Sequence, residues 1–107
     1  MNCNGQEKIK TISTIELKAL LAKESIQLLD VRSPEEIAAG VIKTSIFANY
    51  FERDFTEKAL KQLDNTKPVY LVCRSGNRSG KSAIILKEKG FDVYNVVGGY
   101  LQWVKEN

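Results

Sequence analysis

The sequence of 107 residues has no histidine, only two cysteines and two prolines, and no long apolar segment. The absence of histidine excludes Ser-His-Asp and Cys-His catalysis and most zinc sites. No segment approaches the ~18 apolar residues that a membrane-spanning helix requires. The sequence therefore predicts no metal site, no cofactor and no membrane span, and any nucleophile has to be activated by backbone dipoles and arginines.

The charge balance of the chain is mild, with a formal net charge of +3. It has no long Lys/Arg run and no basic face interleaved with aromatic residues, so nucleic-acid binding is not indicated. Hydrophobic residues make up 43% of the chain, which is enough for a single core. We expect residues 1–8, which are polar and aperiodic, to be a flexible lead-in and residues 9–107 to form one domain.

Short apolar segments alternate with helical patterns along the chain. Helix starts are marked by the capping box Ser13–Glu16 and by Ser33 followed by Pro34. Strands are predicted at residues 10–12, 26–31, 44–47, 69–72 and 92–97, and helices at 13–21, 33–40, 56–63, 78–89 and 100–105. This alternation predicts an α/β fold, a small parallel five-stranded sheet with helices on both faces. Ligands of such sheets bind outside the carboxyl ends of the strands.

Cys73 is the residue best placed for chemistry. It follows the apolar run Val69–Val72 and opens the loop Cys73–Ser79, which contains a glycine and two arginines and leads into a predicted helix. Converging loop amides and a helix N-terminus stabilise a thiolate, and lowering a thiol pKa by about two units takes roughly 2.7 kcal/mol of such stabilisation. The alternative is a small buried cysteine that ends a core strand. The loop favours the reactive interpretation.

Three segments of the chain together resemble those of a single-domain rhodanese, a sulfurtransferase fold. They are Leu29–Glu36, the loop Cys73–Ser79, and Val97–Tyr100 with Trp103. In this order and spacing they are specific, and the resemblance covers roughly Ile9 to Val104.

The resemblance implies sulfur transfer with Cys73 as the catalytic residue. Cys73 would take a sulfane sulfur from a small anionic donor such as thiosulfate, hold it as a persulfide, and pass it to cyanide or to a thiol of glutathione, a thioredoxin-like protein or another protein. Arg78 would steady negative charge at the end of the loop. The residues implied to bind the donor and the persulfide are Arg74, Ser75, Gly76, Asn77, Arg78 and Ser79.

Asp30 and Arg32 end a predicted strand and are expected to lie behind the loop. They form either a surface ion pair or a support in which Asp30 accepts loop amides or pairs with an arginine, and the resemblance favours the support. Arg74 either binds the donor anion or points to solvent, and the sequence leaves this open. We expect Ser79 to cap the following helix and Gly76 to adopt a backbone angle that other residues resist.

Tyr100 and Trp103 are predicted to be core anchors rather than a substrate platform.

One segment departs from the family pattern. Where the family commonly has Gly-His-Ile-Pro-Gly-Ala, this chain has Gly40-Val41-Ile42-Lys43-Thr44-Ser45. The histidine, the proline and the second glycine are missing. We therefore expect a differently shaped turn into the third strand and draw no conclusion about contacts from Val41 or Lys43.

Two other functions compete with sulfur transfer. Cysteine-dependent phosphatases and arsenate reductases follow a Cys-x5-Arg spacing, whereas Cys73 to Arg78 is Cys-x4-Arg, a tighter loop that suits a single added sulfur. No aspartate is evidently placed as the general acid that a phosphatase needs. A non-enzymatic binding or regulatory module often lacks the cysteine, which is present here within a full loop.

Cys3 lies in the polar lead-in, far in sequence from Cys73, and a structural disulfide between the two is not expected. Its role stays open among three. We favour a plain cytosolic N-terminus, which predicts a cytoplasmic protein. Alternatively, Cys3 is a lipidated residue behind a removed signal peptide, which predicts a periplasmic or lipid-anchored protein. The third alternative is a resolving thiol for Cys73.

Overall fold

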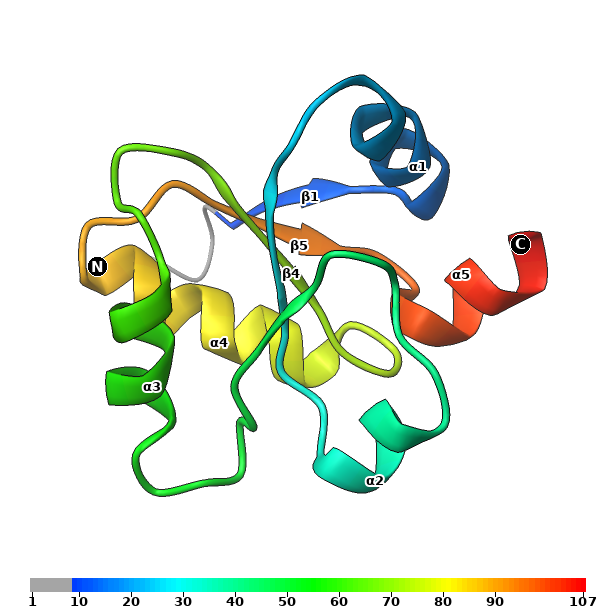
Figure 1. Ribbon diagram of the computed structural model, residues 1–107. Coiled ribbons are helices and arrows are strands. Elements are labelled where there is room, and N and C mark those ends of the chain that lie inside the picture. Colours follow the sequence, from blue (N-terminus) through cyan, green and yellow to red (C-terminus); the bar gives the residue numbers. More distant parts are fainter. Residues whose placement is uncertain (1–8) are drawn as a thin grey trace.

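The computed structural model describes residues 9–107, so the predictions for residues 1–8 and for Cys3 lie outside the described residues. Strands and helices alternate from end to end of this range (Figure 1). In chain order they are β1 (Lys10–Ile12), α1 (Thr14–Lys23), β2 (Gln27–Asp30), α2 (Pro34–Ala38), β3 (Ile46–Phe47), α3 (Phe55–Gln62), β4 (Val69–Val72), α4 (Asn77–Glu88), β5 (Val93–Val96) and α5 (Gly99–Glu106).

The strands form a single sheet in the order β1-β5-β4-β2-β3, and every neighbouring pair is parallel. The predicted parallel five-stranded α/β fold is thus confirmed. β2 and β4 are central neighbours in register, with Asp30 beside Val72. Since both strands run the same way, the residues that follow them, including Cys73, gather at one edge of the sheet.

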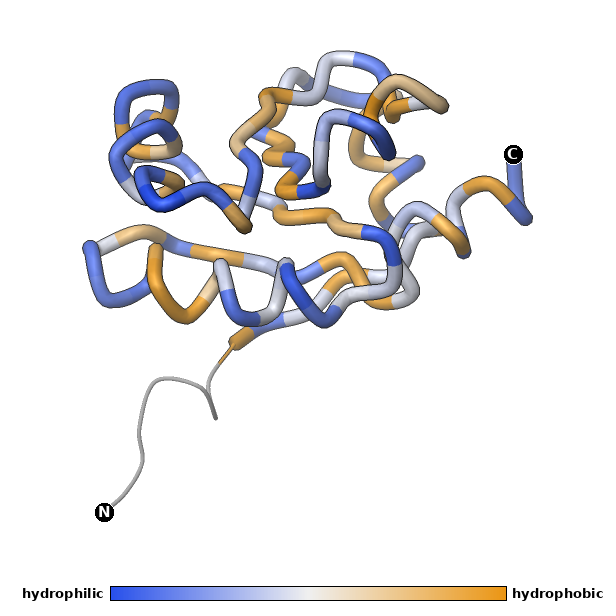
Figure 2. The backbone as a smooth tube through the Cα atoms, turned by 90° about the horizontal axis from the view of Figure 1, so that it is seen from below, coloured by the Kyte–Doolittle hydropathy of each residue, from blue (hydrophilic) through white to orange (hydrophobic). Residues whose placement is uncertain are grey.

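The two faces of the sheet bury separate apolar clusters, because successive strand residues point to opposite sides. Leu28 and Val72 pack with Leu17 of α1 on one face. Leu29 and Leu71 pack on the other face, where α3 and α4 supply further apolar side chains. Figure 2 shows the hydrophobic stretches of backbone concentrated in the strands between the helices. Helices cover both faces, as predicted.

The aromatic residues of α5 belong to the core. Tyr100 and Trp103 are partly buried and pack against the cluster that α1 covers. They are therefore core anchors, as the sequence predicts, and they fix α5 against the sheet.

Both predicted helix starts are capping boxes. The Ser13 and Ser33 hydroxyls accept the backbone N–H groups of Glu16 and Glu36, and each glutamate side chain accepts the N–H group of its serine. The second box places α2 directly after β2, near the end of β4 that leads into α4 (Figure 1).

The turn before β3 contains the one non-glycine residue with positive φ among residues 9–107, Thr44 at 71°. Thr44 occupies the position of the second glycine in the family pattern, and a left-handed conformation is what glycine favours. Thr44 therefore holds a left-handed conformation at the cost of strain in a β-branched residue, and the expectation of a differently shaped turn stays a prediction.

Candidate active site

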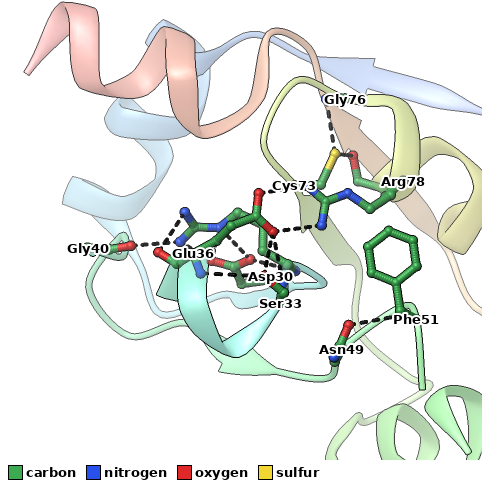
Figure 3. A network of polar contacts seen from close by, with 11 residues as sticks. Asp30, Ser33, Glu36, Gly40, Asn49, Phe51, Cys73, Gly76 and Arg78 are labelled. Carbon is green, nitrogen blue, oxygen red and sulfur yellow. Dashed lines mark hydrogen bonds and ion pairs between the residues drawn. The ribbon is translucent and has the colours of Figure 1, made fainter. Parts of the chain in front are cut away.

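The candidate site lies at the carboxyl ends of β2 and β4. Cys73 follows β4 directly, and its loop leads into α4 at Asn77. Asp30 ends β2, and α2 begins four residues later. Figure 3 shows Cys73, Glu36 and Arg78 close together, with Asp30 next to Glu36. Segments about 40 residues apart in sequence thus form one site.

The Cys73 sulfur is held by hydrogen bonds from its own loop. The Gly76 N–H group donates to the sulfur at 3.0 Å, and the Ser79 hydroxyl lies 3.3 Å from it. Burial of Cys73, which is 1% exposed, opposes ionisation. The hydroxyl and amide of Ser79 and the amides of Gly76 and Ser75 outweigh the burial, so the pKa of the thiol is lowered. This is the electrostatic environment of a nucleophile.

Gly76 gives the loop its shape. It has φ 110° and ψ −10°, a left-handed conformation, and it immediately precedes α4. The prediction that this position needs a backbone angle unfavourable to other residues is confirmed. The angle turns the Gly76 N–H group toward the sulfur while its carbonyl faces the other way, toward Asn95.

The carbonyl groups of the loop are bound by the first turn of α5. The N–H group of Tyr100 donates to the Cys73 oxygen at 2.8 Å, and that of Leu101 donates to the Arg74 oxygen at 3.1 Å. A Cβ atom on Gly99 would lie 2.5 and 2.6 Å from the same two oxygens. Gly99 therefore permits the close approach that holds the loop with its N–H groups facing the sulfur.

Ser79 has a different role from the predicted one. The N-terminal cap of α4 is Gly76, which offers no side chain, and Ser79 lies inside the helix, fully buried. Its hydroxyl contacts the Asn95 Oδ1 atom at 2.6 Å as well as the sulfur. The prediction of a helix cap is wrong because the left-handed glycine starts the helix three residues earlier, which turns Ser79 inward.

Asn95 was missed by the sequence analysis. It lies in β5, donates from Nδ2 to the Gly76 oxygen at 3.1 Å and accepts the Ser79 hydroxyl at Oδ1. It therefore ties the loop to the neighbouring strand. The available signal was a single amide side chain in the otherwise apolar and aromatic strand Val93–Val96.

Arg78 forms a two-pronged ion pair with Glu36. Nη1 and Nη2 each lie 2.8 Å from one carboxylate oxygen, and the Phe51 ring lies 5.2 Å from the guanidinium carbon (Figure 3). The Arg78 hydrogen bonds lower the pKa of Glu36 to about 2, against an opposing effect of burial. Glu36 in turn raises the pKa of Arg78. The sequence analysis gave Glu36 no role beyond the resembling segment.

Asp30 and Arg32 form a buried pair, so the surface alternative is wrong. The Arg32 Nη2 atom lies 2.8 Å from Oδ2 of Asp30, with 3% and 0% of the two side chains exposed. Backbone and Nε groups of Arg32 also donate to the Asp30 carboxylate. The guanidinium stacks on the Tyr100 ring at 4.1 Å and donates to the Gly40 oxygen. The sequence predicted that Asp30 either accepts loop amides or pairs with an arginine, and the structure shows the pair with an arginine.

The remaining loop residues face outward. Arg74, Ser75 and Asn77 are exposed, and Gly76 is half-buried. Their proposed donor-binding role stays a prediction.

Within residues 9–107, no group of three or more His, Cys, Asp or Glu side chains is arranged to hold a metal ion. The same range contains no helix that is both long and apolar enough to cross a membrane.

Comparison with known proteins places this geometry in a family. The model of the rhodanese-like domain matches residues 13–106. The Bacillus subtilis protein named "Putative sulfurtransferase YtwF" is 40% identical over 100 residues, which is 92% of this chain and 94% of that protein.

Two solved structures are similar over most of their length. A rhodanese-like domain protein from Staphylococcus aureus is 35% identical, with a TM-score of 0.80, over 89% of this chain and 91% of that one. A rhodanese-related protein from Thermoplasma volcanium is 30% identical, with a TM-score of 0.81, over 92% and 93% of the two chains.

Proposed function

Because the chain belongs to the rhodanese-like domain family, we propose that it is a sulfurtransferase in which Cys73 carries the sulfur as a persulfide. The observation that carries the proposal is the Cys73 sulfur, which accepts the Gly76 N–H group, lies 3.3 Å from the Ser79 hydroxyl and has a lowered pKa. The thiolate is the form that attacks sulfur, and a lowered pKa increases its share.

In the first half-reaction the Cys73 thiolate attacks the outer sulfur of a donor such as thiosulfate. A bond forms between the two sulfur atoms while the donor S–S bond breaks, and sulfite leaves with the electron pair of that bond. The negative charge of the thiolate then resides on the outer sulfur of the persulfide. Loop amides between Arg74 and Ser79 are available to bind that charge, because α5 holds the loop from the opposite side through the Cys73 and Arg74 carbonyl groups.

In the second half-reaction an acceptor attacks the outer sulfur. A thiolate of glutathione or of a partner protein forms the new S–S bond, and the Cys73 thiolate leaves; cyanide in the same role yields thiocyanate. The hydrogen bonds that stabilise the Cys73 thiolate as a nucleophile also make it a good leaving group. No proton transfer through histidine is required, in agreement with a chain that contains none.

The competing phosphatase function receives less support. The spacing from Cys73 to Arg78 is one residue shorter than in cysteine phosphatases. A tetrahedral phosphoryl group needs a wider loop to bind its oxygens.

The test is steady-state sulfur transfer from thiosulfate to cyanide and to glutathione. Cys73→Ser is expected to abolish transfer while its circular dichroism stays that of the wild type, since the change is nearly isosteric. Cys3→Ser is the matched control and should change little unless Cys3 resolves the persulfide. A folded Cys73→Ser variant with undiminished turnover contradicts the assignment. A folded wild type without any turnover favours the binding module.

A further inference from the structure

Glu36 is held by more contacts than a helix cap requires. Its Oε1 atom accepts the N–H group and the hydroxyl of Ser33, each at 3.0 Å, and also Nη1 of Arg78, while Oε2 accepts Nη2 of Arg78. A carboxylate offers about four acceptor sites, so these contacts use its capacity. The same side chain thus closes the capping box of α2 and binds the arginine of the catalytic loop.

The second capping box of the chain shows which part of this arrangement belongs to the cap. Glu16 accepts the Ser13 N–H group at 2.9 Å in the same way, but within residues 9–107 its hydrogen bonds are those of the cap alone. Glutamine serves in a capping box as well as glutamate does. The negative charge at residue 36 is therefore not needed for the helix, and its counterpart is Arg78.

Arg78 is the loop cation whose charge bears on the sulfur. It follows Cys73 by five residues, lies in the first turn of α4, and is only 17% exposed. Negative charge on Cys73 contributes to its raised pKa, after the larger effect of Glu36. With Glu36 in place, the two charges cancel at short range. An approaching anion therefore meets a neutral pair.

From this geometry we propose that Glu36 is a specificity-determining residue, which limits how strongly the site takes up anions by neutralising Arg78. An anionic sulfur donor has to compete with Glu36 for the guanidinium, whereas an uncharged reagent does not. The proposal rests on the proposed function for its physiological meaning. The predicted selectivity of Cys73 between anionic and uncharged reagents does not depend on whether the protein transfers sulfur.

The experiment compares two alkylating reagents that differ in charge. Iodoacetate is an anion and iodoacetamide is neutral, and both react with the Cys73 thiolate. We measure the ratio of their second-order rate constants in Cys3→Ser protein, so that Cys73 is the one thiol present. Glu36→Gln is expected to raise the iodoacetate-to-iodoacetamide ratio by about three- to tenfold at low salt, because Arg78 gains an unbalanced charge. The increase should fall as salt is added.

Glu16→Gln is the matched control. It makes the same change in the other capping box and is expected to leave the ratio as in the parent. Glu36→Ala is a second uncharged variant that should also raise the ratio, and circular dichroism identifies which variants are folded. A ratio that stays at the parent value or falls in a folded Glu36 variant overturns the proposal.

Sulfur transfer provides the second readout. If the proposed function holds, Glu36→Gln should lower the KM for thiosulfate by a similar factor with a smaller change in kcat. If the labelling ratio rises but no variant transfers sulfur, the role of Glu36 stands and the proposed function fails. If transfer occurs but the ratio and the KM are both unchanged, only the role of Glu36 fails.

Discussion

Two arginine–carboxylate pairs lie at the same edge of the sheet and differ in their access to solvent. The Asp30–Arg32 pair is buried, with 0% and 3% of its side chains exposed, whereas Glu36 and Arg78 are 26% and 17% exposed. The buried pair joins residues two positions apart, and the other joins two elements 42 residues apart. The Asp30–Arg32 pair is suited to fixing the backbone, whereas the Glu36–Arg78 pair is suited to an exchange in which Arg78 binds another anion.

The contacts around each pair support this difference. Arg32 stacks on Tyr100 and donates to two backbone carbonyl oxygens, that of Gly40 and, at 3.4 Å, that of Glu36. The buried pair therefore fixes the segment that carries Glu36. In the Glu36–Arg78 pair, the exposed Phe51 ring lies beside the guanidinium. Solvent screening makes such a pair weaker, as the proposed competition between an anionic donor and the carboxylate requires.

The largest effect is expected from breaking the buried pair. Asp30→Asn leaves the Arg32 charge buried without its counter-charge, which should lower the free energy of unfolding by about 3 kcal/mol or more. Urea denaturation measures this loss. Asp92→Asn is the control, because Asp92 pairs with Lys10 at the surface and about half of each side chain is exposed; its effect should stay below about 1 kcal/mol. Equal effects of the two changes would contradict the distinction between buried and exposed pairs.

The partly exposed pair of Glu36 and Arg78 should affect activity more than stability. Arg78→Ala is expected to reduce sulfur transfer by about tenfold, because it removes the cation and leaves Glu36 near the sulfur. It should also raise the pKa of Cys73, measured from the pH dependence of iodoacetamide labelling. Arg78→Lys should restore part of the charge effect but not the two-pronged contact.

An unchanged labelling midpoint in Arg78→Ala would assign the stabilisation of the thiolate to the loop amides and Ser79. Unchanged sulfur transfer in that variant would show that Arg78 has no role in the reaction.

The sequence predicts the fold and proposes the nucleophile because both depend on local patterns. Short apolar runs that alternate with capped helices indicate the parallel sheet, and Cys73 precedes a glycine-containing loop. The partners of these residues depend on tertiary contacts. Glu36 meets Arg78 only after β2 and β4 pair, and Asn95 reaches Ser79 from β5. The role of Ser79 was predicted wrongly because the start of α4 at a left-handed glycine is not visible as a cap.

A substitution at Ser79 distinguishes two effects on the pKa of Cys73, that of the Ser79 hydroxyl and that of the Glu36–Arg78 ion pair. Ser79→Ala removes the hydroxyl that is the largest of the effects lowering the pKa of Cys73. The pKa should therefore rise, and labelling near neutral pH should slow, while the Glu36–Arg78 pair is untouched. Ser82→Ala is the control, since its hydroxyl is also buried in α4 but bonds the Arg78 carbonyl. A midpoint that moves equally in both variants would refute a specific contact to the sulfur.

The smallest expected effect is the pH dependence of the stability that the Glu36–Arg78 pair contributes. The pKa of Glu36 is about 2 in the folded protein against 4.5 for an unperturbed glutamate. The lowered pKa means that the pair stabilises the fold above about pH 4.5 and that this contribution is lost as the pH falls toward 2. Because solvent screens the pair, we expect a contribution of about 1 kcal/mol.

Stability against urea, measured across this pH range, should fall less steeply in Glu36→Gln than in the wild type. The Glu16→Gln control reveals how much any capping-box glutamate contributes. Identical pH profiles for wild type and Glu36→Gln would mean that the pair adds nothing measurable.

Mass spectrometry of the protein after reaction with thiosulfate tests the persulfide most directly. The account predicts the added mass of one sulfur atom on the peptide that contains Cys73, its removal by cyanide, and its absence in Cys73→Ser. A folded wild-type protein that gains no sulfur on Cys73, or that carries the sulfur on another residue, would contradict the account.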